Sequence, residues 1–283
     1  MMQTALQFLL LAAGAYALVV GLVFLGQRHL MYHPGGVAGA PADAGLPTAR
    51  ALRVATADGL ALQSWYLAPA PGRPIVLYLH GNAGTIADRA YKARLLADQG
   101  IGVMLAEYRG YGGNPGHPTE AGLYADARAN LSWLADQGHG ADETIVYGES
   151  LGTGVAVQAA LELAEAGTPA RALVLEAPFT TMADAAGVHY PWLPTGLLTR
   201  DRYDSSAKIG AVRCPVLVIH GDRDRVVPQD QGKRLFALAA APKTAAWLPG
   251  AGHGDVYDFG AGEALLDFLM PPLGESGGHS SGR

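Results

Sequence analysis

Short apolar segments alternate with longer segments of helical periodicity between residues 75 and 270, and this alternation constrains the fold more than any other feature. The apolar segments contain almost no polar residue, as is typical of strands in a parallel sheet that helices cover on both faces. The pattern therefore predicts an α/β fold with a mostly parallel sheet. The predicted strands are 75–79, 102–106, 144–147, 172–175, 216–219 and 244–248, and the predicted helices are 87–98, 120–136, 151–166, 229–240 and 263–270.

Two further segments come before this alternation. Residues 51–67 form two β-patterned halves separated by Asp58-Gly59, a pair typical of a tight hairpin turn. Residues 34–49 are rich in Pro, Gly and Ala, and we expect a linker or an extended arm there. We therefore expect one α/β domain over residues 50–272 and a disordered Gly- and Ser-rich tail over residues 273–283.

The N-terminal stretch has no charged side chain before Arg28, and residues 5–26 are almost entirely apolar. As a helix this run extends about 33 Å, enough to cross a bilayer core of roughly 30 Å. A cleaved signal peptide would have a basic residue before a shorter apolar run and a small-x-small site directly after it. A helix buried inside the domain is the other alternative, and the lack of a polar face disfavours it. We therefore expect a retained single-pass membrane anchor and its junction within residues 1–33.

The charge distribution bears on topology and on partners. Arg28, Arg50 and Arg53 follow the apolar run and no basic residue precedes it, which favours the cytoplasmic side for the large domain. The net charge is −5 and no basic cluster is present, so we expect no nucleic-acid partner. Cys214 is the only cysteine, which excludes an intrachain disulfide.

The spacing G-x-S-x-G occurs three times, around Ser150, Ser276 and Ser280. A nucleophilic serine in an α/β fold needs a strand before it and a helix directly after it, so that its hydroxyl stands clear on a sharp turn. Ser150 has both, whereas Ser276 and Ser280 follow a double proline in the predicted tail. Ser150 is therefore the candidate nucleophile, and a helix-capping serine is the structural alternative.

A serine hydroxyl needs a base, and in this fold an acid and then a histidine follow the serine along the chain. Elimination among the later histidines leaves His253, on a glycine-rich loop after the last predicted strand. The acid should follow the strand at 216–219, where Asp222 and Asp224 both qualify by position. We therefore expect a triad of Ser150, His253 and one of these two aspartates.

Acyl transfer places negative charge on the former carbonyl oxygen, and two backbone N–H groups normally stabilise it. One donor is expected from the residue after the nucleophile, Leu151. The second is expected from the loop after the first parallel strand, where Asn82 has the required position. A simple Gly- and Asn-rich turn is the structural alternative for that loop.

Six short motifs can be compared with known families: MYHP (31–34), HGNAG (80–84), EYRGYGGNPG (107–116), GESLGTG (148–154), DRYDS (201–205) and HGDRDRVVP (220–228). With them, the chain resembles the α/β-hydrolase superfamily over roughly residues 51–270. It is similar in particular to the membrane-anchored serine hydrolases that include BEM-type proteins, some of whose eukaryotic relatives are protein depalmitoylases. In that group one N-terminal hydrophobic segment precedes the catalytic domain.

The resemblance implies a triad of Ser150, Asp224 and His253, which favours Asp224 over Asp222. It implies Asn82 and Leu151 as oxyanion donors and structural roles for the residues of the RGYGG loop, Arg109 and Tyr111.

The segment 180–206 occupies the position of a lid in the superfamily, and its length excludes a large cap. We expect this insert to line an apolar acyl pocket, and its packing onto the body is the alternative. The candidate pocket residues are Tyr190, Trp192 and Leu193, together with Leu197 and Leu198.

These features predict a serine hydrolase that cleaves carboxylic esters or thioesters of a small molecule or lipid through an acyl-enzyme intermediate. This chemistry requires neither a metal nor an organic cofactor. A peptidase or aminopeptidase of the same fold is one alternative, because amides are attacked by the same triad. A non-catalytic anchored protein that binds an acyl ligand or a protein partner is the other.

Overall fold

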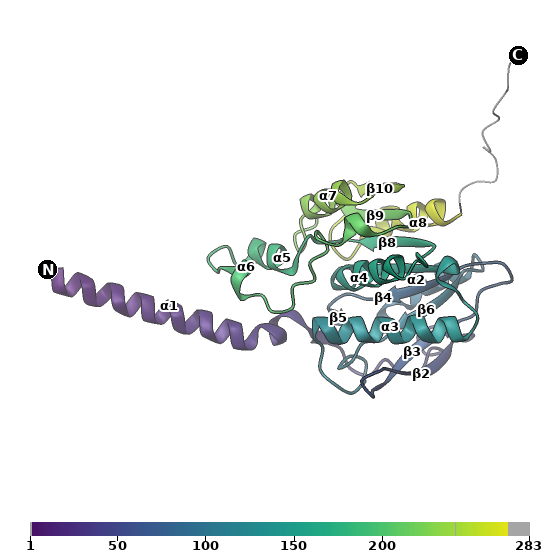
Figure 1. Cartoon of the computed structure of the whole chain (residues 1–283), viewed down its shortest axis with the longest axis horizontal. Coiled ribbons are helices and arrows are strands. Elements are labelled where there is room, and N and C mark those ends of the chain that lie inside the picture. The colour runs from purple at the N-terminus through teal and green to yellow at the C-terminus, as the bar shows by residue number, and fades with distance from the viewer. Residues whose placement is uncertain (1, 241, 271–283) are drawn as a thin grey trace, which may run out of the picture.

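The computed structural model describes residues 2–240 and 242–270, so the predicted tail with Ser276 and Ser280 lies outside the described residues. A central sheet of eight strands organises the domain (Figure 1). All its neighbouring strands pair in parallel except β2 with β3 and β3 with β6. The spatial order is β10 (Lys243–Leu248), β9 (Val216–Gly221), β8 (Ala172–Glu176), β7 (Thr144–Glu149), β4 (Ile75–Leu79), β6 (Gly102–Ala106), β3 (Ala61–Leu67) and β2 (Arg50–Ala55).

Helices cover both faces of this sheet. Alternate residues of β4 show the division: Ile75, Leu77 and Leu79 belong to one buried apolar cluster, and Val76 and Tyr78 belong to the other. The first cluster includes residues of α3 (Glu120–Asp136), α4 (Leu151–Glu165) and α7 (Gln229–Leu238), and the second includes residues of α2 (Ala90–Ala97) and α8 (Ala261–Leu269).

The predicted α/β-hydrolase fold is confirmed, and the six parallel strands lie within two residues of their predicted ends. The predicted helix at 87–98 differs at its start, where a 3-10 turn, η1 (Ile86–Arg89), precedes α2. Thr85 caps this turn through a reciprocal capping box with Asp88. Shorter 3-10 turns are η2 (Ala141–Glu143), η3 (Ile209–Ala211) and η4 (Val256–Phe259).

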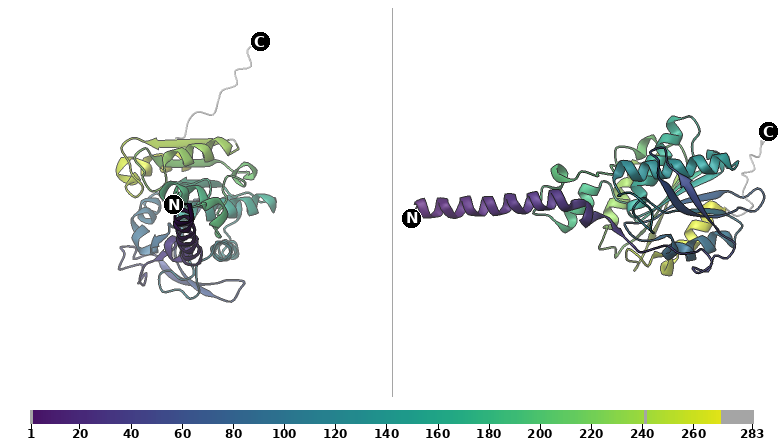
Figure 2. Two further views of the ribbon diagram at one scale, coloured as in Figure 1. Left: turned by 90° about the vertical axis from the view of Figure 1, so that its left-hand side faces the viewer. Right: turned by 90° about the horizontal axis from the view of Figure 1, so that it is seen from below.

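The N-terminal apolar segment forms one long helix, α1 (Met2–Met31), which projects from the domain (Figures 1 and 2). No residue of α1 is buried. Within residues 2–240 and 242–270 it is the one helix whose length and composition suit a membrane span. A helix with no buried residue cannot be a core helix of this domain, so the structure removes that alternative.

Residues 34–49, predicted as a linker or extended arm, lie against the domain. The short strand β1 (His33–Pro34) pairs in parallel with β5 (Ala83–Gly84), directly after Asn82. Further along, Leu46 is buried in the same cluster as α2 and α8. The arm therefore fixes the end of α1 to the loop that follows β4.

The insert between β8 and β9 contains two short helices, α5 (Met182–His189) and α6 (Thr195–Leu198). It lies beside the C-terminal part of α1 (Figures 1 and 2). Contacts between the two include the hydrogen bonds Tyr16–Trp192, Gln27–Leu198 and Gln27–Arg200 and the ion pair Arg28–Asp201. Directly after α1, the Tyr32 hydroxyl is hydrogen-bonded to that of Tyr203.

Candidate active site

Ser150 stands on the turn between β7 and α4, with a φ of 49° and a ψ of −115°. This conformation is unusual for a residue with a side chain and costs on the order of 1–3 kcal/mol, which the surrounding structure must offset. The Ser150 N–H donates to the Glu176 carbonyl over 2.8 Å, which fixes the turn to β8. The Ser150 side chain makes no helix-capping hydrogen bond, so its hydroxyl is free for another partner.

The two glycines that flank Ser150 are required by close backbone contacts. A Cβ added at Gly152 would lie 2.0 Å from the Leu79 carbonyl oxygen, and one at Gly148 would lie 2.4 Å from the Gly152 carbonyl oxygen. Both distances are far below van der Waals contact. Because the obstructing atoms are backbone, no side-chain movement can relieve them, and the spacing G-x-S-x-G is a packing requirement of this turn.

The structure brings His253 and Asp224 to this serine from two later loops. His253 Nε2 lies 2.9 Å from Ser150 Oγ, and His253 Nδ1 lies 2.7 Å from Asp224 Oδ2. Asp222 lies elsewhere, because its Oδ1 accepts the Gly250 N–H at 2.7 Å. Of the two aspartates that qualified by position, Asp224 is therefore the one that contacts the imidazole.

Asp224 is held as a carboxylate by its surroundings. Burial opposes its charge, but hydrogen bonds from His220 and His253 and from the Val227 N–H outweigh that effect and hold the pKa of Asp224 well below its ordinary value. The Val226 and Val227 N–H groups both donate to Oδ1 at 2.8 Å, which leaves Oδ2 for His253. A carboxylate in this position keeps the proton of His253 on Nδ1 and leaves Nε2 free to accept one.

The two predicted oxyanion donors lie beside Ser150. Asn82 and Leu151 both line the pocket that contains the serine. Within the described part of the chain, neither backbone N–H donates to a protein acceptor. The Asn82 carbonyl accepts hydrogen bonds from the His33 N–H and the Tyr111 hydroxyl, both at 2.9 Å, so this residue is held in place while its N–H stays free.

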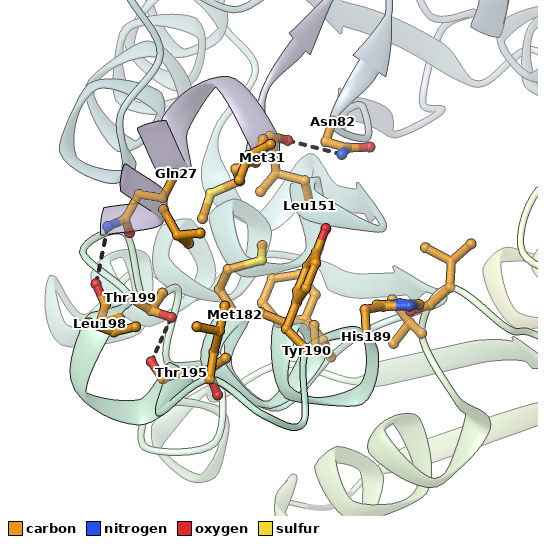
Figure 3. Close-up of a pocket in the computed structure, with 18 of the residues that line it drawn as sticks. Gln27, Met31, Asn82, Leu151, Met182, His189, Tyr190, Thr195, Leu198 and Thr199 are labelled. Atoms are coloured by element: carbon orange, nitrogen blue, oxygen red, sulfur yellow. Dashed lines mark hydrogen bonds between the residues drawn. The ribbon is translucent and has the colours of Figure 1, made fainter. Parts of the chain in front are cut away.

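The pocket at Ser150 has a volume of about 320 Å³ and lies between α1 and the insert (Figure 3). Met31 and Leu151 stand on one side, facing Met182 and Tyr190 on the other. His189 and Tyr190 are the two residues of this lining whose side chains can gain or lose a proton. The lining residues are Val23, Gln27, Leu30, Met31, Asn82, Ser150, Leu151, Phe179, Met182, Ala185, Ala186, His189, Tyr190, Leu193, Thr195, Leu198, Thr199, Val226 and Val227.

The candidate pocket residues of the insert divide into two groups. Tyr190, Leu193 and Leu198 line the pocket, and Trp192 and Leu197 do not. Trp192 is 52% exposed and Leu197 is 87% exposed, on the outside of the insert. The sequence pattern could not separate the two groups, because the short helix α6 and the prolines around it follow no single period.

Sequence reasoning missed the contribution of α1, which supplies four of the lining residues. It also missed a buried ionic cluster behind the turn that carries Ser150. Lys92 Nζ lies 2.9 Å from carboxylate oxygens of both Glu149 and Glu176, and Arg89 reaches Glu149 at 2.6 Å. The one hint of this cluster in the sequence is Glu149, an acidic residue that directly precedes Ser150.

The RGYGG loop has the structural role that the resemblance implied. Arg109 is buried and pairs with Asp58 at 2.6 Å and with Asp126 at 2.8 Å, and Tyr111 supports the Asn82 carbonyl. In the described part of the chain, no cluster of His, Cys, Asp and Glu side chains is arranged to hold a metal ion.

Two comparisons connect this site to known families. The family model described as serine aminopeptidase, S33 (Hydrolase_4) matches residues 70–200. The chain is 43% identical over 261 residues to the uncharacterized protein Rv2307c of Mycobacterium tuberculosis, and the alignment covers 91% of each chain.

Other similarities are more partial. The lysophosphatidylserine lipase ABHD12 of Danio rerio is 38% identical over 186 residues, which cover 60% of this chain and 48% of that protein. Among solved structures, the esterase Pf2001 of Pyrococcus furiosus superposes with a TM-score of 0.66 at 19% identity, covering 86% of this chain and 98% of that one. An α/β hydrolase of Vibrio vulnificus has a TM-score of 0.67 at 22% identity, covering 79% of this chain and 82% of that one.

Proposed function

This chain belongs to the α/β-hydrolases, in one family with Rv2307c, and we propose that it is a membrane-anchored serine hydrolase of carboxylic esters. One observation carries the proposal. The Ser150 hydroxyl lies 2.9 Å from His253 Nε2, and the other nitrogen of that ring lies 2.7 Å from a buried carboxylate. A nucleophile, a base and an orienting acid in hydrogen-bond contact form the arrangement that activates a serine.

In the proposed mechanism, His253 Nε2 accepts the Ser150 proton as Oγ attacks the ester carbonyl. The Asn82 and Leu151 N–H groups stabilise the oxyanion, a contribution that is typically about 10²–10³ in kcat for one donor. Asp224 holds the imidazole in orientation and stabilises its charged form. His253 then protonates the leaving alcohol, and water attacks the acyl-enzyme by the same route to release the acid.

The pocket supports an apolar acyl group as the substrate part bound beside Ser150. Its lining contains no Asp, Glu, Lys or Arg side chain, and the residues that α1 and the insert contribute are mainly aliphatic. The lipase activity in the name of ABHD12 agrees with a single-chain acyl ester of a lipid. The resemblance to the BEM-type hydrolases extends the proposal to thioesters, because a thioester carbonyl is attacked by the same groups.

An aminopeptidase activity is less well supported by the same pocket, although the matching family model carries that description. A site for a free N-terminal amine needs a carboxylate that faces the substrate. Asp184 is the acidic residue of the insert helix α5, and its carboxylate accepts a hydrogen bond from the Thr180 hydroxyl instead of lining the pocket.

Labelling with a fluorophosphonate probe tests the catalytic proposal. We expect wild type to be labelled and Ser150→Ala to lose the label completely, with the exposed Ser132→Ala as the matched control that keeps it. Equal labelling of wild type and Ser150→Ala would refute Ser150 as the nucleophile. A series of p-nitrophenyl esters of increasing chain length, compared with aminoacyl p-nitroanilides, then separates the esterase from the aminopeptidase.

We further propose that α1 is retained as the anchor and that the domain lies on the cytoplasmic side, as the positions of Arg28, Arg50 and Arg53 favour. Protease digestion of the full chain in sealed, inverted membrane vesicles, whose cytoplasmic face is outside, tests this topology, and we expect the domain to be digested. A domain that resists digestion until detergent opens the vesicles contradicts it.

A further inference from the structure

We propose that residues 190–198 of the insert are embedded in the membrane leaflet beside α1, so that the pocket at Ser150 opens into the lipid acyl chains. The substrate class is then an ester of a membrane-resident lipid, whose acyl chain enters the pocket sideways from the bilayer. The substrate part of this inference depends on the proposed esterase function, whereas the embedding of the insert can be measured without catalysis.

The first support is that the apolar parts of α1 and of the insert end side by side, where each segment reaches its first charged residues. The first charged residue of α1 is Arg28, and the first charged residues after the apolar part of the insert are Arg200 and Asp201. Although these segments are 173 residues apart, Arg28 forms two hydrogen bonds with the Asp201 carboxylate, at 2.8 and 3.0 Å. The adjacent Gln27 accepts the Arg200 N–H at 2.8 Å. One plane therefore separates apolar from charged residues in both segments.

The second support is the composition and exposure of the insert on the apolar side of this plane. The segment 190–198, YPWLPTGLL, contains no charged residue. Its outer side chains are exposed in the isolated chain, with Leu197 at 87%, Trp192 at 52% and Tyr190 at 42%. Adjacent exposed apolar side chains of this size are uncommon on a surface that faces water.

The third support is that the insert pairs most of its backbone carbonyl groups within the protein. A segment in hydrocarbon has no water for its backbone polar groups, so pairing inside the protein favours its burial there. From Tyr190 to Leu198, every carbonyl oxygen except those of Pro191 and Leu197 accepts a hydrogen bond, whereas the Trp192 and Gly196 N–H groups have no acceptor within the described residues. Two of the carbonyl bonds come from α1, since Tyr16 donates to Trp192 and Gln27 donates to Leu198.

The depth of the insert follows from the same contacts. Eleven residues separate Tyr16 from Gln27, which corresponds to about 16 Å along the axis of a helix. One leaflet of hydrocarbon is roughly 15 Å thick. With Gln27 at the boundary, the contact between Tyr16 and Trp192 lies near the far limit of that leaflet, and the insert occupies the leaflet next to the domain.

The pocket connects this embedded surface to the nucleophile. Its lining includes Val23 and Gln27 of α1 and Leu198 of the insert as well as Ser150, Leu151 and Asn82. Figure 3 shows Gln27 and Leu198 at one end of the pocket and Asn82 and Leu151 at another. A lipid acyl chain can thus pass from the leaflet to Ser150 without crossing water, which removes the cost of exposing its methylene groups, about 0.8 kcal/mol each.

A depth measurement tests the embedding. Leu197→Cys and Val37→Cys, each in a Cys214→Ala background, are labelled with a nitrobenzoxadiazole fluorophore in the full chain in phosphatidylcholine nanodiscs. Val37 is the matched control, because it is also strongly exposed, at 79%, but follows the anchor on the domain side. We expect nitroxide-labelled acyl chains to quench the probe at 197 more than the probe at 37, and iodide in the buffer to quench in the opposite order. Stronger iodide quenching at 197, or protection of 197 from both quenchers as by a protein partner, overturns the proposal.

A kinetic comparison tests the entry route. Leu197→Asp places a charge in the leaflet and leaves the pocket lining unchanged. We expect it to reduce turnover of a long-chain ester in the bilayer about tenfold or more while water-soluble p-nitrophenyl acetate is hydrolysed at the wild-type rate, and Val37→Asp to change neither. Equal loss on both esters, or loss on neither, contradicts lateral entry. If wild type hydrolyses neither ester, the proposed function fails and the quenching result still decides the embedding.

Discussion

Replacement of Lys92 by Met is the perturbation whose magnitude follows most directly from the structure. Lys92 Nζ lies 2.9 Å from Glu149 Oε2 and 2.9 Å from each carboxylate oxygen of Glu176, and its side chain is only 4% exposed. Burial opposes the charge of Lys92, but the fields of Glu176 and then of Glu149 outweigh it and raise the pKa of Lys92 above its ordinary value. Met has a similar volume, so the substitution removes the cation and keeps the packing.

Loss of the cation leaves Glu176 buried without a positive partner, whereas Glu149 keeps Arg89. Removing one partner of a buried ion pair typically costs about 3–5 kcal/mol. Each kcal/mol shifts the melting temperature of a domain of this size by roughly 2–4 °C, so we expect a decrease of about 6–20 °C. Differential scanning fluorimetry of the full chain in detergent micelles measures it.

Two further variants separate the charge effect from a general loss of packing. Lys92→Met combined with Glu176→Gln removes the unpaired carboxylate, and we expect it to recover more than half of the lost melting temperature. Lys233→Met at an exposed position is expected to change the melting temperature by less than about 2 °C, as is usual for surface substitutions. The reasoning is wrong if Lys92→Met melts within that same small range, or if the double variant is no more stable than Lys92→Met.

Three other predictions concern the turn of the nucleophile and the triad acid. Asp224→Asn should lower kcat by about 10⁴, because His253 loses the carboxylate that sets its tautomer; ester hydrolysis of the purified chain measures it, and a loss of less than tenfold contradicts the role. Gly152→Ala should prevent correct folding, since its Cβ would lie 2.0 Å from the Leu79 carbonyl oxygen, whereas Gly36→Ala, with no atom within 4 Å, should leave yield and melting temperature unchanged. The low pKa of Asp224 stabilises the folded state above about pH 4, the ordinary range of Asp, and this stabilisation is lost as the pH falls toward the native value. The melting temperature of wild type should therefore fall more steeply than that of Asp224→Asn between pH 5 and pH 2, and parallel profiles contradict this.

Local patterns were sufficient to predict the sheet and the turn of the nucleophile. The strands that are buried on both faces, such as β4 and β9, are continuous apolar runs, and each is followed by glycines that open the loop after it. The contacts of Gly148 and Gly152 are within the same turn as Ser150 or with the adjacent strand, so the short motif carries most of the information about that geometry. For the same reason His253 was found by its position after the last strand.

Contacts between distant segments were beyond the reach of those patterns. Nothing in the sequence pairs Arg28 with Asp201 or places Val23 in the same pocket as Ser150, because the apolar residues of a long helix cannot be told apart without their neighbours. The same limit applied to His220. Its position within a strand excluded it as the base, yet its Nε2 lies 3.3 Å from Asp224 and helps to keep that carboxylate charged.

Hydrogen bonds join the end of α1 to the loop that carries the proposed oxyanion donor Asn82. The last residue of α1, Met31, accepts a hydrogen bond from the Asn82 side chain at 3.0 Å, and the His33 N–H donates to the Asn82 carbonyl at 2.9 Å. Asn82, whose N–H is proposed to stabilise the oxyanion, is therefore hydrogen-bonded to the end of α1 and to the residue after it. Because the Asn82 N–H must point at the reacting oxygen to within a few tenths of an ångström, the position of α1 relative to the domain sets the geometry of the site. A helix that served only to tether the domain would need no contact with this residue, so its hydrogen bonds to Asn82 argue that anchoring and catalysis are coupled.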